Sequence, residues 1–246
     1  MKTHIIIPCY NEAKRLPFAT FADYIQTHED VRFCFSDDGS TDETRGLLEQ
    51  FAKQQPEGRV IVTGDTVNRG KAEAVRAGAN ALLKQADVAD TCIGFWDADL
   101  ATPLSEIERF RDILSGTQSC RAVVGERRPG RDVHISRNPI RNIVGRTIRG
   151  IVHNYNHVPV PDPICGAKLF TADTAAAIFA EPFLTRWVFD VELFIRMRKR
   201  LPAFDFSQVV SLPLLQWNEV PGSKVRFYEG FRILADLIKI QRHYEK

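Results

Sequence analysis

Thr91-Cys92-Ile93-Gly94-Phe95-Trp96-Asp97-Ala98-Asp99 joins an apolar run to two aspartates that are one residue apart. The apolar run predicts a buried strand that ends where the polar pair begins. Carboxylates at positions i and i+2 of a strand face the same side, so both can reach one hard cation. In an α/β sheet, ligands bind at such strand ends. The alternative is an acidic turn that caps a helix starting near Pro103.

The first half of the chain alternates between strand-like and helix-like patterns. Residues 4–8 form a continuous apolar run, as expected of a parallel strand that is buried on both faces. This alternation predicts a parallel sheet with right-handed crossovers. Further strands are expected at residues 31–36, 59–63 and 91–96, and helices at residues 13–28, 43–54 and 72–85.

Polar residues follow each of these strands. Because parallel strands end at one edge of the sheet, we expect the four polar loops to lie together there. The sequence therefore predicts one site built from four strand ends. The loops contain Tyr10 to Glu12, Asp37 with Asp38, Arg69 to Lys71, and Asp97 with Asp99.

The second half of the chain continues the α/β pattern without an internal repeat or an interdomain linker. We therefore predict a single domain over residues 1–246, with a doubly wound, mostly parallel sheet flanked by helices. Strands are expected at residues 121–126 and 204–215, with a short strand at the end of the loop 162–170. Helices are expected at residues 105–114, 138–154, 171–179, 188–200 and 225–244.

The charge of the chain is small overall but uneven. A formal net charge of +2 is too small to indicate nucleic-acid binding. Residues 121–149, however, are rich in arginine and contain only two acids, Glu126 and Asp132. A basic segment of this kind predicts an anionic partner.

The cysteines and the apolar stretches indicate the compartment. The 5 cysteines form no CxxC pair, which argues against a disulfide framework or a zinc site and fits a reducing compartment. Residues 5–7 are too short for a signal peptide, and no apolar stretch approaches the roughly 18 residues that span a bilayer. We therefore expect a cytoplasmic protein without a transmembrane segment.

Two common nucleotide-binding motifs are absent. No GxGxxG follows the first strand, and Gly70-Lys71 is not a P-loop, because Gly64 is one residue too far upstream and Ala72 replaces the required Ser or Thr. What remains is an acidic sheet edge followed by a basic segment. Two aspartates there would bind a divalent cation, which would neutralise a diphosphate, and arginines would hold a second anion.

The motifs, taken in order, resemble the family-2 inverting glycosyltransferases of the GT-A fold, over about residues 4–225. The first half supplies Pro8-Cys9-Tyr10-Asn11-Glu12, Asp37-Asp38-Gly39-Ser40-Thr41-Asp42, Gly70-Lys71 and Asp97-Ala98-Asp99. The second half resembles the polyprenyl-phosphate branch, which includes dolichyl-phosphate mannose synthase and dolichyl-phosphate glucosyltransferase. Its segments are Val124-Gly125-Glu126-Arg127, Ser136-Arg137-Asn138 with Arg141, Asp162 to Phe170, Phe189-Asp190-Val191-Glu192 and Gly222-Ser223-Lys224-Val225.

The resemblance implies metal-dependent transfer of a sugar, with inversion, from a nucleotide-diphosphate sugar to a polyprenyl (dolichyl or undecaprenyl) phosphate. Residues 1–100 would form the nucleotide-binding half, residues 101–225 the acceptor half, and residues 225–246 a C-terminal amphipathic helix. Lys71 would lie at the rim of the nucleotide pocket. The nucleotide-sugar site would comprise Pro8, Tyr10, Glu12, Asp37, Asp38, Lys71, Asp97, Ala98, Asp99, Ser223 and Lys224.

The resemblance also assigns the catalytic groups, which would be Asp97, Asp99, Arg127 and Arg141. The two aspartates would hold Mg²⁺ or Mn²⁺ on the donor diphosphate, while Arg127, Arg137 and Arg141 would bind the acceptor phosphate. A lipid monophosphate is already an anionic nucleophile near neutral pH, so no strong general base is required. The enzyme must instead align two anions and screen their repulsion.

The sequence departs from the family pattern in three places. Ala101 stands where some mannosyltransferases of this branch have glutamine, and the usual Asp-Thr-Gln-Cys-Gly-Phe-Lys loop reads Asp-Pro-Ile-Cys-Gly-Ala-Lys at residues 162–168. These two departures concern the complete set of metal ligands and the details of acceptor binding. In the third, residues 183–187 echo the QxxRW motif of processive polysaccharide synthases, with Phe183 in place of the glutamine.

Several alternatives stay open at this stage. A transferase that acts on a soluble saccharide or a protein would need a general base, for which Asp190 is the candidate. A non-catalytic nucleotide-sugar-binding protein is the other class. The donor is either GDP-mannose or a UDP-hexose, and lipid length and oligomeric state stay open. A lipid acceptor implies peripheral contact with the inner face of a membrane, through the amphipathic segments 138–154 and 225–244.

Overall fold

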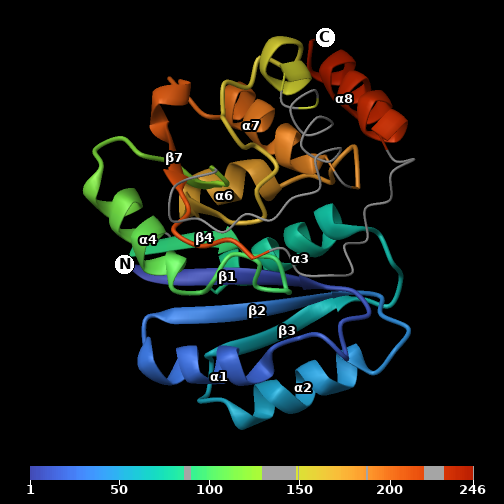
Figure 1. Ribbon diagram of the computed structural model, residues 1–246, viewed down its shortest axis with the longest axis vertical. Coiled ribbons are helices and arrows are strands. Elements are labelled where there is room, and N and C mark those ends of the chain that lie inside the picture. The colour runs from blue at the N-terminus through green and yellow to red at the C-terminus, as the bar shows by residue number, and fades with distance from the viewer. Residues whose placement is uncertain (86–89, 129–147, 149, 187, 219–229, 246) are drawn as a thin grey trace.

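A computed structural model places one sheet of seven strands, in the order β3-β2-β1-β4-β6-β5-β7, with helices on both of its faces (Figure 1). The structure describes residues 1–85, 90–128, 148, 150–186, 188–218 and 230–245. The strands are β1 (Lys2–Cys9), β2 (Val31–Asp38), β3 (Val60–Asp65), β4 (Thr91–Phe95), β5 (Ala122–Glu126), β6 (Lys168–Thr171) and β7 (Val209–Pro213).

Over the first half of the chain the helices and strands alternate as expected. The helices are α1 (Phe18–Thr27), α2 (Thr44–Gln54), α3 (Lys71–Leu83), α4 (Glu106–Gly116), α6 (Ala172–Phe179), α7 (Phe189–Arg200) and α8 (Gly230–Tyr244). The region expected to form a helix over residues 138–154 lies mostly outside the described residues. So does the predicted start of the last helix, at residues 225–229.

The sheet is parallel except at one strand. β1 pairs in parallel with β2 and β4, and β2 pairs in parallel with β3. β6 runs antiparallel to both of its neighbours, β4 and β5. The prediction of a doubly wound, mostly parallel sheet is confirmed, and the reversed strand is the feature that the sequence pattern did not indicate.

Two apolar clusters pack on the two faces of the sheet. Because side chains of a strand alternate between faces, Ile5 and Ile7 of β1 join the cluster that contains Phe21 of α1 and Leu48 of α2. The intervening Ile6 joins the other cluster, which includes residues of α3, α6, α7 and α8. Strands buried on both faces explain why the sequence shows continuous apolar runs rather than alternation.

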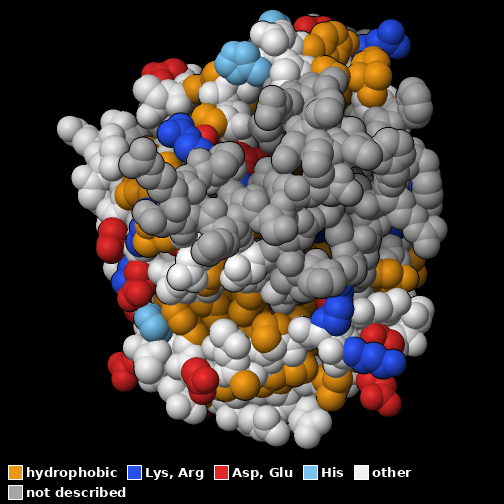
Figure 2. All heavy atoms as spheres, in the orientation of Figure 1, with side chains coloured by type: hydrophobic (Ala, Val, Ile, Leu, Met, Phe, Trp, Pro, Cys, Tyr) orange, Lys and Arg blue, Asp and Glu red, His pale blue; other side chains and the backbone are white. Residues whose placement is uncertain are grey.

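The five cysteines are all free and buried. In the described part of the chain no helix is long and apolar enough to cross a membrane. Charged side chains of both signs are scattered over the described part of the face in Figure 2, which agrees with the small net charge of +2.

Gly94 allows the reversed strand to pair with β4. A Cβ atom on Gly94 would lie 2.1 Å from the carbonyl oxygen of Lys168. This oxygen belongs to the backbone, so it cannot move unless the strand itself moves. The antiparallel register aligns Gly94 with Leu169. A side chain at this position would therefore push β6 away from the centre of the sheet.

We predict that Gly94→Ala lowers the free energy of unfolding by about 1–3 kcal/mol, the usual cost of overpacking a core. Urea unfolding measures this loss. Gly116→Ala is the matched control, because nothing lies within 4 Å of its Cβ position at the end of α4. An unfolding midpoint for Gly94→Ala equal to that of Gly116→Ala would contradict the close approach of β4 and β6.

Candidate functional site

The candidate site lies at the edge where the parallel strands end. β1 ends at Cys9, which pairs with Asp37 near the end of β2, and β4 ends at Phe95. The loops that follow β1, β2 and β4, together with the N-terminus of α3, carry the predicted nucleotide-binding residues. The structure thus brings together the first-half residues that the sequence placed at one edge.

The loops after β1 and β2 are joined by hydrogen bonds that the sequence did not predict. Asn11, which has a positive φ of 50°, accepts a hydrogen bond from the Thr41 amide at 2.8 Å and donates its own amide proton to Ser40 Oγ at 2.9 Å. The Glu12 amide donates to Thr44 Oγ1 at 2.8 Å. Asn is among the residue types that tolerate this backbone conformation, and that preference was the available signal.

Two predicted nucleotide-binding carboxylates already have protein partners. Glu12 is buried, and its oxygens accept hydrogen bonds from Nε and Nη2 of Arg15 at 2.8–3.0 Å. Asp37 accepts from the Ser40 hydroxyl at 2.5 Å. Pro8 lies within β1, and Tyr10 is partly exposed directly after it. The structure therefore holds these carboxylates in fixed orientations at the edge.

Asp38 fixes the loop that precedes α3. Its carboxylate accepts hydrogen bonds from the Arg69 amide at 2.7 Å and from the Gly70 amide at 2.9 Å. Burial raises the pKa of Asp38 above its ordinary value, although these two amides act in the opposite direction. Asp38 thus sets the shape of the backbone from which Lys71 projects.

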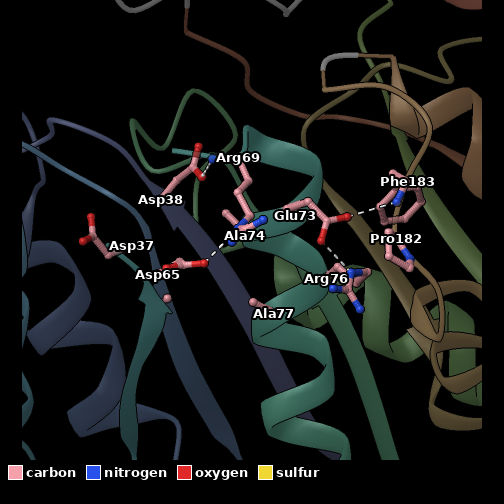
Figure 3. A pocket seen from close by; sticks show the side chains of 11 residues that line it. Asp37, Asp38, Asp65, Arg69, Glu73, Ala74, Arg76, Ala77, Pro182 and Phe183 are labelled. Carbon is pink, nitrogen blue, oxygen red and sulfur yellow. Dashed lines mark hydrogen bonds and ion pairs between the residues drawn. The ribbon is translucent and has the colours of Figure 1, made fainter. Parts of the chain in front are cut away.

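A cavity of about 460 Å³ opens beside Asp37 and Asp38 (Figure 3). One wall comes from the ends of β2 and β3, and the opposite wall comes from α3 and from Pro182 with Phe183. Carboxylates in such a wall can accept hydrogen bonds from a base or from sugar hydroxyls. Its lining residues are Asp37, Asp38, Gly64, Asp65, Arg69, Glu73, Ala74, Arg76, Ala77, Pro182 and Phe183.

Asp97 and Asp99 lie in a turn rather than on a strand. β4 ends at Phe95, and the Leu100 amide donates a hydrogen bond to the Asp97 carbonyl at 3.1 Å. The expectation that the two carboxylates share one side of an extended strand is therefore wrong. Burial and then the negative charge of the neighbouring Asp97 raise the pKa of Asp99 above its ordinary value.

Asp97 is held from two directions. Its Oδ1 atom lies 2.5 Å from Nζ of Lys71, so Lys71, expected at the pocket rim, reaches the acidic pair itself. A Cβ atom on Gly166 would lie 1.8 Å from Oδ2 of Asp97, so the loop 162–168 packs directly on this carboxylate. Although burial alone would lower it, the pKa of Lys71 is raised by Asp97, Asp190 and Asp99.

The acidic pair fits a divalent cation. Two neighbouring carboxylates repel one another, and oxygen ligands of this kind are what Mg²⁺ and similar hard cations prefer. Asp99 uses Oδ1 to accept a hydrogen bond from the Ala101 amide at 3.1 Å. Within the described ranges no cluster of three or more His, Cys, Asp or Glu residues could hold a metal.

Arg127, predicted to bind the acceptor phosphate, is paired with Asp162. Its Nε and Nη2 atoms each lie 2.7 Å from an oxygen of that carboxylate, and the guanidinium lies 5.7 Å from the centre of the Trp217 ring. Although burial alone would raise it, the pKa of Asp162 is lowered by its hydrogen bonds with Arg127. The other predicted anion-binding residues lie outside the described residues: Arg137, Arg141, Ser223 and Lys224.

A buried ion pair lies next to the acidic turn. Lys168, which is 0% exposed, donates to Asp190 at 2.5 Å and to the carbonyl oxygen of Cys165 at 2.5 Å. These contacts fix the loop that carries Gly166. Lys168 was missed as an organising residue, since a lysine inside a short apolar strand gives no signal of its partner. Asp190, the candidate general base, is occupied by this pair.

Comparison with known proteins gives a family match over most of the chain. Residues 4–172 match the sequence model of the family described as Glycosyl transferase family 2. The chain is 29% identical to the dolichyl-phosphate beta-glucosyltransferase of Dictyostelium discoideum, covering 98% of this chain and 74% of that protein. It is 28% identical to the human protein of the same name, covering 98% of this chain and 75% of that protein.

The fold is shared with a solved enzyme of lower sequence identity. Glucosyl-3-phosphoglycerate synthase from Mycobacterium tuberculosis, in a complex with Mn²⁺, UDP-glucose and phosphoglyceric acid, superposes with a TM-score of 0.69 at 16% identity. The match covers 98% of this chain and 80% of that one. This similarity confirms the predicted GT-A architecture.

We predict that Asp162→Asn lowers the free energy of unfolding by about 3 kcal/mol at neutral pH, because it leaves the Arg127 guanidinium without its counter-ion. Asp162 has a lowered pKa in the folded chain. Its stabilisation is therefore full above the ordinary value of 3.8 and is lost as the pH falls through the lower folded value. Urea unfolding at a series of pH values measures the difference from the wild type.

Asp173→Asn is the matched control for this experiment. Asp173 also pairs with an arginine, Arg121, but its side chain is 59% exposed. Its loss should cost less than about 1 kcal/mol. Equal losses for the two variants at neutral pH, or a loss for Asp162→Asn that does not shrink in acid, would contradict the assignment.

Proposed function

This chain belongs to glycosyl transferase family 2, in its polyprenyl-phosphate branch, and we propose that it transfers glucose from UDP-glucose to a polyprenyl phosphate with inversion. The observation that carries the proposal is the acidic turn of Asp97 and Asp99, set beside Lys71 at the end of β4. Similarity over nearly the whole chain to dolichyl-phosphate beta-glucosyltransferases supports the acceptor class.

UDP-glucose is the donor that the related proteins support. The relatives that match nearly the whole chain are named as glucosyltransferases, and the enzyme of similar fold was crystallised with UDP-glucose. The cavity beside Asp37 and Asp38 offers carboxylate acceptors for the N–H and hydroxyl groups of a nucleoside. GDP-mannose is the competing donor that an experiment must include.

Asp97 and Asp99 would hold Mg²⁺ or Mn²⁺. When bound, the cation supplies positive charge that neutralises the donor diphosphate as it becomes the leaving group. Lys71 adds a positive charge at the same place, because its ammonium already lies on Asp97. Ser223 and Lys224 are proposed to approach the same diphosphate from the C-terminal loop.

The reaction needs alignment more than proton transfer. An oxygen of the acceptor phosphate attacks the anomeric carbon and forms a new C–O bond, while the bond from that carbon to the diphosphate oxygen breaks and its electron pair leaves with UDP. No proton has to be removed from a phosphate that is already ionised. Correct placement of the two anions therefore supplies most of the catalysis.

Arg127 is proposed to bind the acceptor phosphate, together with Arg137 and Arg141. The bidentate contact with Asp162 holds the Arg127 guanidinium in one orientation, so little conformational entropy is lost when a phosphate binds. A hydroxyl acceptor would instead need a general base. Asp190, the candidate for that role, is paired with Lys168, which favours an acceptor that is already ionised.

A lipid acceptor requires the chain to reach a bilayer surface, and we propose peripheral contact. In α8, Leu237 and Ile240 are buried against the protein, while Leu234 is 39% exposed. The described part of this helix therefore packs on the body of the molecule and leaves limited apolar surface for lipid. Flotation with liposomes that contain polyprenyl phosphate checks the proposal; protein that stays at the bottom of the gradient would refute it.

We predict that the chain transfers radiolabelled glucose from UDP-glucose to dolichyl or undecaprenyl phosphate in the presence of Mn²⁺ or Mg²⁺. Asp99→Asn should lower the rate about a hundredfold or more, since a bound metal contributes several kcal/mol to such a step. Thin-layer separation of the glycolipid product measures the transfer. Asp112→Asn on the exposed side of α4 is the matched control and should keep the wild-type rate.

Competing outcomes separate the alternatives. Faster transfer from GDP-mannose would replace the donor assignment. Transfer to free sugars but not to the lipid phosphate would favour the soluble-acceptor enzyme. Donor binding without turnover on any acceptor would favour a non-catalytic nucleotide-sugar-binding protein.

A further inference from the structure

The segment 183–186, which connects α6 to α7, lies against the first turn of α3. The Phe183 amide donates to Oε1 of Glu73 at 3.0 Å, a contact that Figure 3 shows beside the cavity. The Ala72 amide donates to the carbonyl oxygen of Arg186 at 3.4 Å. Two hydrogen bonds thus join the acceptor half of the chain to the helix that carries Lys71.

The Arg186 side chain binds the loop that precedes α3. Its Nε atom donates to the Arg69 carbonyl at 3.1 Å, and its Nη2 atom donates to the Asn68 carbonyl at 3.0 Å and to the Asn68 side-chain oxygen. Gly70 makes this approach possible, because a Cβ atom there would lie 2.7 Å from Nε of Arg186. The guanidinium therefore packs directly on the loop backbone.

Asp38 binds the same loop from the other side. Its carboxylate accepts from the Arg69 and Gly70 amides, whereas Arg186 donates to the Asn68 and Arg69 carbonyls. The backbone of residues 68–70 is therefore held between an anion that takes its N–H groups and a cation that takes its carbonyl groups. The next residue is Lys71, which contacts Asp97.

The segment 183–186 is also bound by side chains of α7 and α8. The Leu184 amide donates to Oε2 of Glu192 at 2.9 Å, and Nζ of Lys239 on α8 donates to the Leu184 carbonyl at 2.8 Å. Glu192 is 0% exposed and also binds Nη2 of Arg196 at 2.7 Å and the Tyr244 hydroxyl at 2.9 Å. Arg186 thus projects from a support that includes α7 and α8.

We propose that Arg186 is a positioning residue of the donor site, which sets the backbone of residues 68–70 and thereby the side chains of Asp38 and Lys71. Arg186 acts through that loop and does not touch the reacting atoms. The consequence for donor binding rests on the proposed function, since it places the donor beside Asp38 and Lys71. The effect of Arg186 on the backbone of residues 68–70 does not depend on the proposed function.

Hydrogen exchange tests the positioning role without substrate. In Arg186→Ala, amides in residues 68–72 should exchange about tenfold faster, because hydrogen bonds of this kind each contribute about 0.5–1.5 kcal/mol net. Arg186→Lys keeps one positive charge but not the forked geometry, so its exchange should fall between Arg186→Ala and the wild type. Arg198→Ala is the matched control, because Arg198 also donates to a backbone carbonyl, that of His157, which is not part of this loop.

Donor titration provides the second measurement. Binding of UDP-glucose with Mn²⁺ to Arg186→Ala should be about tenfold weaker than to the wild type, as the loss of about one or two such hydrogen bonds implies. The KM for the donor should rise, while the KM for the lipid phosphate stays near its wild-type value. Arg198→Ala should change none of these quantities.

The two measurements separate this inference from the proposed function. Unchanged exchange in residues 68–72 of Arg186→Ala would overturn the positioning role. Faster exchange with unchanged donor affinity would also overturn it as a role at the donor site. If the wild type itself binds no UDP-glucose, the donor assignment fails, and the exchange result still decides whether Arg186 holds the loop.

Discussion

The carboxylate of Asp97 is the point on which the candidate site depends. It contacts the ammonium of Lys71 on one side and packs against Gly166 on the other, so three segments that are far apart in the sequence meet at one side chain. The side chain of Asp97 is 41% exposed, and its negative charge is stabilised further by a positive partner nearby. Lys71 is that partner in the structure, and it identifies the place where a divalent cation would be stabilised.

The contact between Asp97 and Gly166 depends on how the loop 162–168 is held in the second half of the chain. Gly166 can approach Asp97 because the loop around it is fixed by Lys168, whose buried ammonium binds Asp190 and the Cys165 carbonyl. The reversed strand β6 begins at this lysine. The first and second halves of the chain are therefore in contact at the acidic turn itself.

Much of the fold was predictable because its signals are local. Continuous apolar runs predicted the parallel strands, and most expected bounds lie within a few residues of the observed ones. The helix expected over residues 13–28 begins only at Phe18, and the strand expected over residues 204–215 begins only at Val209, after a short 3₁₀ turn. The reversed direction of β6 was not predictable, because the long connection before it leaves both directions open. The placement of Asp97 and Asp99 on a strand was wrong, because the chain turns directly after Phe95 and Trp96.

The candidate site was predictable in its residue types and less so in its contacts. Because parallel strands end at one edge of a sheet, the loops of the first half were expected to lie together there, and the structure confirms that arrangement. The partners of these residues come from distant parts of the chain: Arg186 binds Asn68 across 118 positions, and Arg127 binds Asp162 across 35. Periodicity carries no information about such pairs. The roles of Arg137, Arg141, Ser223 and Lys224 stay predictions that lie outside the described residues.

The most direct test of this account is an anomalous difference map from crystals soaked with MnCl₂ and UDP. We expect a manganese peak in contact with the carboxylates of Asp97 and Asp99, with UDP extending from it toward Asp38 and with Lys71 beside the diphosphate. A manganese peak elsewhere, or UDP bound with no metal at the acidic turn, would contradict it.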